Sequence, residues 1–365
     1  MDDLHYWLAL NFLTDIGPVT ARRLLSACGG PGNIFRMSFE ELRKIEGVGE
    51  HRARSITGFN RWEAVRREAG NIAERRMTVL TINDDGYPAP LRAVQDAPLV
   101  LYMKGDFRDV DKYAVSVVGS RRATAYGIEV AERISYRLAS KGLTVVSGMA
   151  RGIDTASHRG ALKAGGRTVA VMGSGLDVPY PPSNRGLMNA VAGSGAVISE
   201  FPLGTLPNKE NFPRRNRIIS ALSLGVIVVE ATLDSGSLIT VAYALEQGRE
   251  VFAVPGNVTS RNSRGTNDLI RKGARLVESA EDVIDELEPQ IKGILREDRL
   301  NDEEILSAMT EDEKALCSYL STGPKHIDSI TRETDTSTAK ALSILLGLEL
   351  KGIVRQTEGK HFSLN

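Results

Sequence analysis

Short apolar runs alternate with longer amphipathic stretches from residue 113 onward. Runs rich in β-branched residues and bounded by turns predict strands that are buried on both faces. The predicted strands are Ala114–Val118, Thr144–Ser147, Thr168–Met172, Ala196–Ser199, Val226–Glu230, Glu250–Val254 and Arg275–Val277. The amphipathic stretches predict helices near residues 125–140, 154–164, 183–192, 214–223, 237–247 and 266–273. This alternation predicts an α/β domain, a doubly wound parallel sheet with helices on both faces.

The first 70 residues have a helical pattern and contain two similar segments, Ile16–Ala21 and Ile45–Ala53. Each places an apolar residue and a glycine-bearing turn before a helix, which is the helix-hairpin-helix pattern. Such a turn either aims free backbone N–H groups at a phosphate or serves only to pack helices together. Residues 77–110 are extended and proline-rich, and we interpret them as a lead-in to the sheet.

The last part of the chain has a different pattern. Residues 289–308 are charged and lack a core pattern, which predicts a linker. A capping box at Thr310–Glu313 opens a helix, and two more helices and a hairpin follow, which predicts a winged helix. We therefore expect a helical module over residues 1–70, a Rossmann-like domain over 77–288, a linker over 289–308 and a winged helix over 309–365.

Composition excludes several classes of protein. The 365 residues hold 46 Lys and Arg against 46 Asp and Glu, so any nucleic-acid surface has to be local. Cys28 and Cys317 are far apart, which argues against a disulfide framework or a thiolate zinc site and fits a reducing cytoplasm. No uncharged run reaches the ~20 residues of a membrane span, and the acidic start does not resemble a signal peptide. We expect a cytoplasmic protein without a metal or a cofactor.

Glycine loops follow several of the predicted strands. In a parallel sheet, ligands bind beyond the carboxyl ends of the strands. Gly119–Arg122 and Ser235–Ser237 occupy such positions and offer backbone N–H groups, hydroxyls and guanidinium groups to a phosphate. The alternative is that they are simply tight turns and helix caps. The fingerprints of dinucleotide binding, of P-loops, of zinc proteases and of serine hydrolases are absent.

The sharpest local feature is the segment Lys209–Arg217, which holds four cations, one acid and an aromatic ring in nine residues. Cations neutralise phosphates, and a ring stacks on an unpaired base. Arginines in the first turn of a helix oppose the helix dipole, which favours a negative partner over a merely solvated helix start. Arg261, Arg264 and Arg271–Lys272 extend this basic surface.

Catalysis has weaker support. Asp154 and His158 lie four residues apart on one face of a predicted helix, and Glu230 ends a predicted strand. We interpret Asp154 as a helix cap, His158 as a packing residue and Glu230 as structural.

The loops and the basic segment together resemble the DprA/Smf family, the DNA-processing proteins of bacteria. The resemblance spans about residues 85–285. It rests on Val117–Arg121, Ser147–Asp154, Ser199–Gly204, Phe212–Ser220, Ser235–Thr240, Gly248–Gly256 and Gly265–Ile270.

The resemblance implies an extended Rossmann fold that binds single-stranded DNA, forms a homodimer, protects incoming DNA during natural transformation and loads RecA recombinase onto it. It implies no established catalytic activity. Carried over by position, the DNA-binding residues are Gly119, Ser120, Arg121, Lys209, Phe212, Arg214, Arg215, Asn216 and Arg217. Additional candidates are Arg122, Ser235, Gly236, Ser237 and Arg264.

Two other functions stay open at this point. Related Rossmann domains include lysine-decarboxylase-like enzymes that hydrolyse nucleoside monophosphates, in which a glutamate such as Glu230 acts, and a nucleotide sensor is a further possibility. Neither needs the aromatic ring and four cations of Lys209–Arg217. The third helix of the winged helix has only Lys340 and Lys351, so protein contact or weak duplex binding is equally plausible for it.

Overall fold

The computed structural model describes residues 3–291, 293–295, 309–321, 323–334, 336–350, 353–357 and 359–364. The chain divides into two compact units, Met1–Arg296 and Glu297–Asn365. Most of the predicted linker lies outside the described residues. The first residues of the predicted linker are helical. They form the end of the last helix of the first unit, which includes Pro289 and ends at Ile291.

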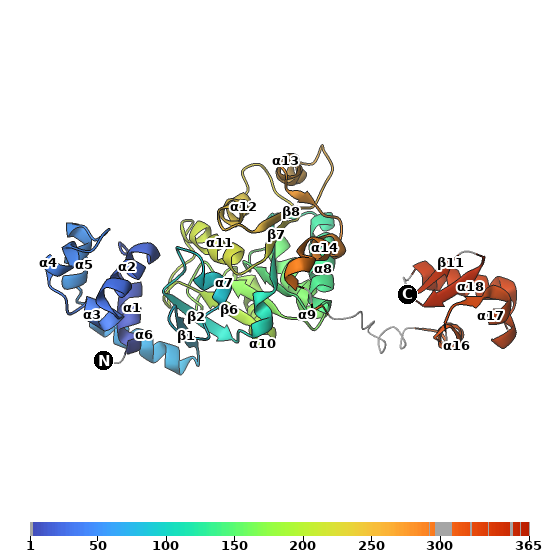
Figure 1. The fold of residues 1–365 in the computed structure, drawn as a ribbon, viewed down its shortest axis with the longest axis horizontal. Helices are drawn as coiled ribbons and strands as arrows, with labels where there is room; N and C mark the ends of the chain where they lie inside the picture. The colour runs from blue at the N-terminus through green and yellow to red at the C-terminus, as the bar shows by residue number, and fades with distance from the viewer. Residues whose placement is uncertain are drawn as a thin grey trace. The chain divides into compact units, whose positions relative to one another are not determined.

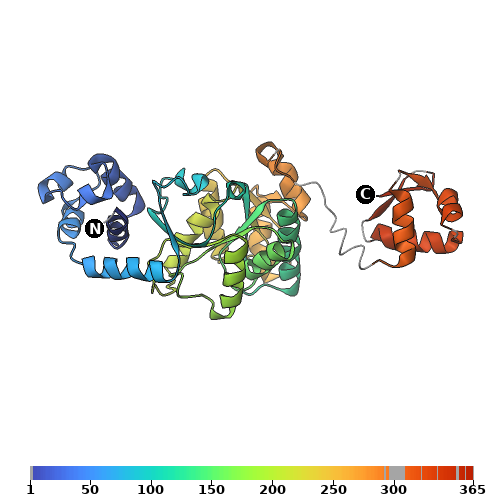
Figure 2. The same ribbon diagram turned by 90° about the horizontal axis from the view of Figure 1, so that it is seen from below.

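The first unit begins with a module of short helices whose two hairpins lie where the glycine-bearing turns predict them (Figure 1). Its core includes the aromatic rings of Tyr6, Phe35, Phe59 and Trp62. The last helix is longer than predicted, ends at Glu74 and leads to the first strand (Figure 2). The helices are α1 (Asp3–Asn11), α2 (Pro18–Cys28), α3 (Pro31–Ile34), α4 (Phe39–Arg43), α5 (Glu50–Thr57) and α6 (Trp62–Glu74).

Hydrogen bonds from side chains to the main chain hold this module against the rest of the unit. Arg22 donates to the carbonyl oxygens of Arg92 and Val94, at 2.6 and 2.9 Å. Asn11 donates to the carbonyl of Glu200, 3.2 Å away. The module and the sheet therefore form one continuous core.

Nine strands form the sheet of the first unit, in the order β1-β2-β6-β5-β4-β3-β7-β8-β9. The strands are β1 (Thr78–Thr81), β2 (Val100–Gly105), β3 (Ala114–Val118), β4 (Thr144–Ser147), β5 (Thr168–Val171), β6 (Ala196–Ser199), β7 (Gly225–Val228), β8 (Glu250–Ala253) and β9 (Arg275–Leu276). The seven predicted strands are β3 to β9, all parallel. The lead-in of residues 77–110 is more ordered than predicted, because β1 and β2 extend the sheet as antiparallel strands beside β6.

Helices cover both faces of the sheet, as the alternating pattern predicts. Buried residues of α8, α9 and α14 pack on one face, and those of α10, α11 and α12 pack on the other. The helices are α7 (Ala89–Arg92), α8 (Ala125–Ser140), α9 (Ile153–Lys163), α10 (Arg185–Ser194), α11 (Asn211–Ala221), α12 (Ser237–Glu246), α13 (Arg264–Arg271) and α14 (Ala280–Ile291). Single 3₁₀ turns lie at Asp109–Lys112, Pro182–Asn184 and Arg261–Ser263. The doubly wound prediction is confirmed.

The second unit is a winged helix, as predicted. Its core includes Leu316, Ile330, Leu345 and Phe362. The predicted capping box is present, because Thr310 accepts from the amide of Glu313 and the Glu313 side chain accepts from the amide of Thr310. The elements are α16 (Glu311–Leu320), β10 (Lys325–His326), α17 (Ile327–Glu333), α18 (Thr338–Leu350), β11 (Val354–Thr357) and β12 (His361–Leu364). Among the described residues, no helix is long and apolar enough to cross a membrane.

Candidate nucleic-acid interface

A cavity of about 730 Å³ lies at the carboxyl ends of β3, β4 and β7. The connections reverse direction here, because β3 has β4 on one side and β7 on the other. Such a switch point is where open α/β sheets bind their ligands. We call this space the switch-point cavity. Gly119–Arg122, Phe212, Arg215 and Ser235–Ser237 are among the residues that line it.

The loop Gly119–Arg122 is shaped by close backbone contacts. A Cβ at Gly119 would lie 2.8 Å from the carbonyl oxygen of Glu230. Gly152 has a φ of +75°, and a Cβ there would lie 2.3 Å from the carbonyl oxygen of Ser120. The glycines are therefore needed for the turn. The loop also places the exposed side chain of Arg121 at the cavity.

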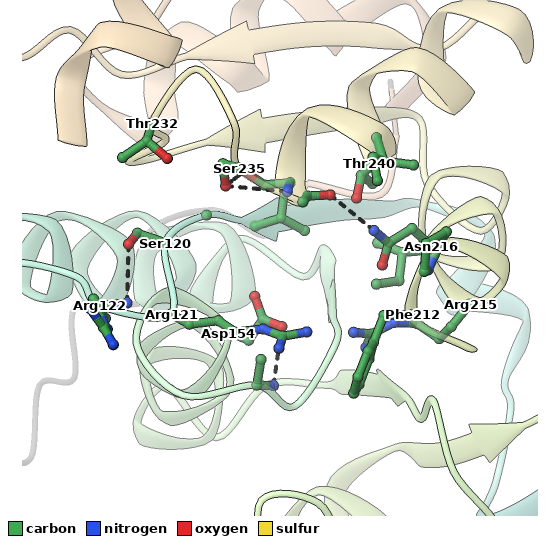
Figure 3. Close-up of a pocket in the computed structure, with 18 of the residues that line it drawn as sticks. Ser120, Arg121, Arg122, Asp154, Phe212, Arg215, Asn216, Thr232, Ser235 and Thr240 are labelled. Carbon is green, nitrogen blue, oxygen red and sulfur yellow. Dashed lines mark hydrogen bonds between the residues drawn. The ribbon is translucent and has the colours of Figure 1, made fainter. Parts of the chain in front are cut away.

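Helix α11 supplies the aromatic wall of the cavity. The guanidinium carbon of Arg121 lies 4.5 Å from the centre of the Phe212 ring, and that of Arg215 lies 6.0 Å from it. Figure 3 shows Phe212 and Arg215 side by side, facing the loop that bears Arg121. A Cβ at Gly173 would lie 2.9 Å from the ring, so the backbone packs closely against it. One ring thus lies close to two cations, and such a combination suits a nucleobase and its phosphate.

Arg215 is a buried cation, only 3% exposed. Its guanidinium donates to the carbonyl oxygens of Gly148 and Val171. Burial lowers the pKa of Arg215 to about 10, against the raising effect of Asp154. The Asp154 carboxylate accepts from the amide of Ala150, and burial raises its pKa. At neutral pH Arg215 therefore remains charged and contributes a fixed positive potential to the floor of the cavity.

The opposite wall is the start of α12. The hydroxyls of Ser235 and Ser237 lie 2.8 Å apart, and Asn216 donates to the carbonyl of Gly236 at 3.2 Å (Figure 3). Nothing lies within 4 Å of a Cβ placed at Gly236, so this helix start is open to a ligand. Within the described chain, the cavity is lined by one carboxylate, Asp154, and by five cations: Arg121, Arg122, Lys209, Arg215 and Arg261. A charge balance of this kind favours a polyanion.

Known families match nearly the whole chain. Residues 78–288 match the family described as DNA recombination-mediator protein A. Residues 302–360 match the DprA winged helix domain, and residues 8–57 match a SAM-like helix-hairpin-helix tandem. The protein Smf of Synechocystis is 32% identical over an alignment of 392 positions, which covers 98% of this chain and 98% of that protein. The chain belongs to the DprA/Smf family.

Other DprA/Smf proteins are similar to this chain in sequence and in structure. The DNA processing protein DprA of Streptococcus pneumoniae is 46% identical over 208 residues, which cover 57% of this chain and 73% of that protein. The X-ray structure of S. pneumoniae DprA superposes with a TM-score of 0.57 at 37% identity, over 74% of this chain and 98% of that chain. A second structure, of DNA processing protein A from Helicobacter pylori, has a TM-score of 0.53 at 30% identity, over 59% of this chain and 97% of that one. The H. pylori structure is described as giving insight into a single-stranded DNA binding mode of that protein.

The structure brings most of the residues predicted from the DprA/Smf resemblance into one cavity. Those that line it are Gly119, Ser120, Arg121, Arg122, Lys209, Phe212, Arg215, Asn216, Ser235, Gly236 and Ser237. Three predicted residues are not among them: Arg214, Arg217 and Arg264. Arg264 starts α13, and Arg261, one turn earlier, lines the cavity instead.

Arg217 and Arg214 point away from the cavity for different reasons. Arg217 is 5% exposed and forms a buried ion pair with Glu200, so its negative partner belongs to the same chain. It also donates to the carbonyl of Asp96, 2.6 Å away. The Arg214 side chain is 59% exposed and lies 3.8 Å from Glu200. Within the first turns of α11, only part of the cationic cluster therefore serves the switch-point cavity.

The acid–base candidates have structural partners. His158 is fully buried, and its Nδ1 lies 2.7 Å from the hydroxyl of Thr168. Burial lowers the pKa of His158 to about 3. The Glu230 carboxylate accepts from the amide and hydroxyl of Thr124 at the start of α8. Glu230 is not among the described residues that line the cavity.

Sequence reasoning missed several lining residues of this DprA/Smf cavity. Thr232 follows β7, Thr240 lies one turn into α12, and Asn262 belongs to the 3₁₀ turn Arg261–Ser263. The position of Thr232 after a predicted strand was a usable signal. The sequence gives no signal for Asn262. Its place at the cavity depends on hydrogen bonds to the carbonyl of Arg122 and to the Glu230 carboxylate, both far away in sequence.

Proposed function

We propose that the switch-point cavity binds single-stranded DNA without strong sequence preference. The observation that carries this proposal is the closeness of both Arg121 and Arg215 to the Phe212 ring in one cavity. Stacking accepts any base, and cations contact phosphates that carry no sequence information. The H. pylori relative, whose structure concerns the binding of single-stranded DNA, supports the choice of ligand.

The wider role that we propose is based on the resemblance to the family. The chain acts in DNA processing and recombination as a homodimer in the cytoplasm, protects the bound strand, and hands it to RecA recombinase without catalysing a reaction itself. The description of the family as a recombination mediator supports this role. Fixed cations such as Arg215 suit a protein that carries DNA. They bind the phosphate backbone of the strand, and they release it when another DNA-binding protein competes for the same phosphates.

Fluorescence anisotropy tests the DNA-binding step. Labelled oligo-dT and a matching duplex are titrated with the full chain and with the double variant Arg121→Ala/Lys209→Ala. Both side chains are exposed and line the cavity, so the variant keeps the fold. We expect the wild type to prefer the single strand and the variant to lose that preference. Equal binding by both proteins would move the DNA site elsewhere.

Two further assays separate the wider role from its alternatives. The first measures RecA filament formation on single-stranded DNA coated with a single-strand binding protein, with and without the wild type or the double variant. Stimulation by the wild type alone is expected. The second incubates the protein with nucleoside monophosphates. Release of free base would restore the nucleotide-hydrolase alternative.

A further inference from the structure

A second cavity, of about 740 Å³, lies where the helical module meets the sheet of the first unit. It is lined by the end of α1, by Gly17 and Pro18 of the first hairpin, by the segment Glu200–Thr205 after β6, and by Arg61 and Arg214. We call it the junction cavity. Its volume is within the ~300–1,000 Å³ range typical of ligand sites.

Helix α11 borders both cavities. Phe212 and Arg215 line the switch-point cavity, whereas Asn211 and Arg214 line the junction cavity. Successive residues of a helix point about 100° apart, so the first turns of α11 present side chains to the two spaces alternately. The two cavities are therefore neighbours across the start of α11.

The junction cavity repeats the combination of arginine and aromatic ring found in the switch-point cavity. The guanidinium carbon of Arg61 lies 5.0 Å from the centre of the Phe12 ring, and that of Arg214 lies 5.1 Å from the Phe201 ring. Arg61 is exposed and has no carboxylate within ion-pair distance among the described residues. Arginine planes and aromatic rings both stack on bases, and the guanidinium also contacts phosphate.

Two polar features of the junction cavity lack a partner within the described chain. Helix α2 begins at Pro18 after Gly17, which is exposed and provides no side-chain cap for the helix amides. Amides at such a helix start bind phosphate. Glu200 is 5% exposed, and its Oε1 accepts no hydrogen bond from any residue that the structure describes. A buried acceptor of this kind is normally satisfied, and an N–H group of a base, such as the ring N–H of thymine, is a suitable donor.

We infer that the junction cavity is a second nucleotide subsite. It holds a later nucleotide of the same single strand whose first part lies in the switch-point cavity. The inference rests on the proposed function. It adds that the helical module contributes to binding of the single strand, through the first hairpin and through Arg61.

The test compares short and long strands. Oligo-dT of about 4 and about 16 nucleotides, the limits of common single-strand site sizes, is titrated by anisotropy. The variant Arg61→Ala/Arg214→Ala is compared with the control Arg66→Ala, an exposed arginine of α6 outside both cavities. We expect the double variant to bind the long strand roughly tenfold more weakly, as suits the loss of two exposed cation contacts, and the short strand as the wild type does. The control should match the wild type on both.

The outcomes distinguish the two proposals. An unchanged affinity of the double variant for the long strand overturns the junction subsite and leaves the switch-point cavity intact. If the double variant loses the same affinity for the short and the long strand, the junction subsite is overturned too. Such a result would show that the substitutions act through the switch-point cavity. If Arg121→Ala/Lys209→Ala leaves short-strand binding unchanged, the proposed function itself has failed.

Photo-crosslinking gives a second measurement that needs no variant. A 5-iododeoxyuridine is placed at successive positions of the long strand, and the crosslinked peptides are mapped. We expect one set of positions to crosslink near Phe212 and a distant set near Phe12 or Phe201. Crosslinks confined to the switch-point cavity at every position would overturn the junction subsite.

Discussion

A Cβ at Gly148 would lie 2.0 Å from the guanidinium of Arg215, so the absence of a side chain at one residue makes room for the charge of the other. Gly148 also accepts a hydrogen bond from Arg215 through its carbonyl. The buried cation of the switch-point cavity therefore depends on the backbone of the loop after β4.

The variant Gly148→Ala should displace Arg215 and weaken binding of single-stranded DNA. Overpacking of this kind costs about 1–3 kcal/mol of the free energy of unfolding. Urea unfolding and anisotropy measure the two effects. The control Gly186→Ala has nothing within 4 Å of the new methyl group, so it should bind as the wild type does and be no less stable, since alanine favours a helix over glycine. Wild-type affinity in Gly148→Ala would show that the position of Arg215 does not matter.

The variant Phe212→Leu should weaken single-strand binding by about 1–3 kcal/mol, the usual contribution of one stacked base. Phe212→Tyr keeps a ring and should retain most of the affinity. Phe107→Leu serves as the control, because Phe107 follows β2 at the opposite edge of the sheet. If the Phe212→Leu and Phe107→Leu variants bind single-stranded DNA with equal affinity, stacking on Phe212 does not contribute to DNA binding.

Salt should weaken binding in a predictable way. If about five phosphates are neutralised per site, the slope of log K against log salt is about −3.5, since each contributes about −0.7 on a single strand. Anisotropy titrations over a range of potassium chloride concentrations give this slope. The variant Arg121→Ala/Lys209→Ala removes up to about two phosphate contacts. Its slope should therefore be less negative than that of the wild type. A slope near zero would contradict a site built on cations.

Acid should destabilise the fold through His158. The Thr168 hydroxyl donates to the carbonyl of Val145, so Nδ1 of His158 donates to Thr168. The buried Nε2 of His158 has no hydrogen-bond partner among the described residues that could accept a proton from it. The pKa of His158 is lowered to about 3, first by burial and then by Arg215. The unfolded chain, with an ordinary histidine pKa of about 6.5, binds this proton more readily. Stability from this residue is therefore complete above pH 6.5 and falls as pH drops toward 3.

At pH 5 the loss from His158 should be roughly 2 kcal/mol relative to pH 7.5, measured by urea unfolding at both pH values. His158→Asn retains a donor near the Nδ1 position and cannot be protonated, so its unfolding free energy should change less between these pH values. An equal change in both proteins would assign the acid sensitivity to other groups.

Arg217→Ala should destabilise the protein much more than Arg214→Ala. Removal of Arg217 leaves the Glu200 carboxylate buried without its closest cation, which typically costs about 3–5 kcal/mol. Arg214 contacts the same carboxylate from the surface, where an ion pair contributes about 0–1 kcal/mol. Urea unfolding of the two variants measures the difference. Similar stability of both would show that the buried pair is not a structural contact.

The parallel strands were predictable because each is a local apolar run, and the position of the cavity followed because carboxyl ends of parallel strands meet at one edge. β2 was interpreted only as an extended lead-in even though Leu99–Tyr102 is an apolar run. The sequence does not show that this run pairs antiparallel with β1 on one side and with β6, nearly one hundred residues later, on the other.

The cationic cluster shows a second limit. The helical phase of Arg214, Arg215 and Arg217 follows from spacing, but the sequence does not show which side of α11 faces the cavity. Glu200 decides the place of Arg217, and Glu200 belongs to the segment after β6. A charge partner that is far away in sequence turns an apparent ligand contact into a structural one.

The contact of Arg22 with the carbonyl oxygens of Arg92 and Val94 has a consequence for how this protein tolerates change. The guanidinium recognises main-chain atoms, which every residue type provides. Side chains along that acceptor loop are thus interchangeable as far as docking is concerned, whereas Arg22 has no equivalent substitute. The loop that accepts from Arg22 can therefore change in sequence without loss of this contact between the helical module and the sheet, whereas Arg22 cannot.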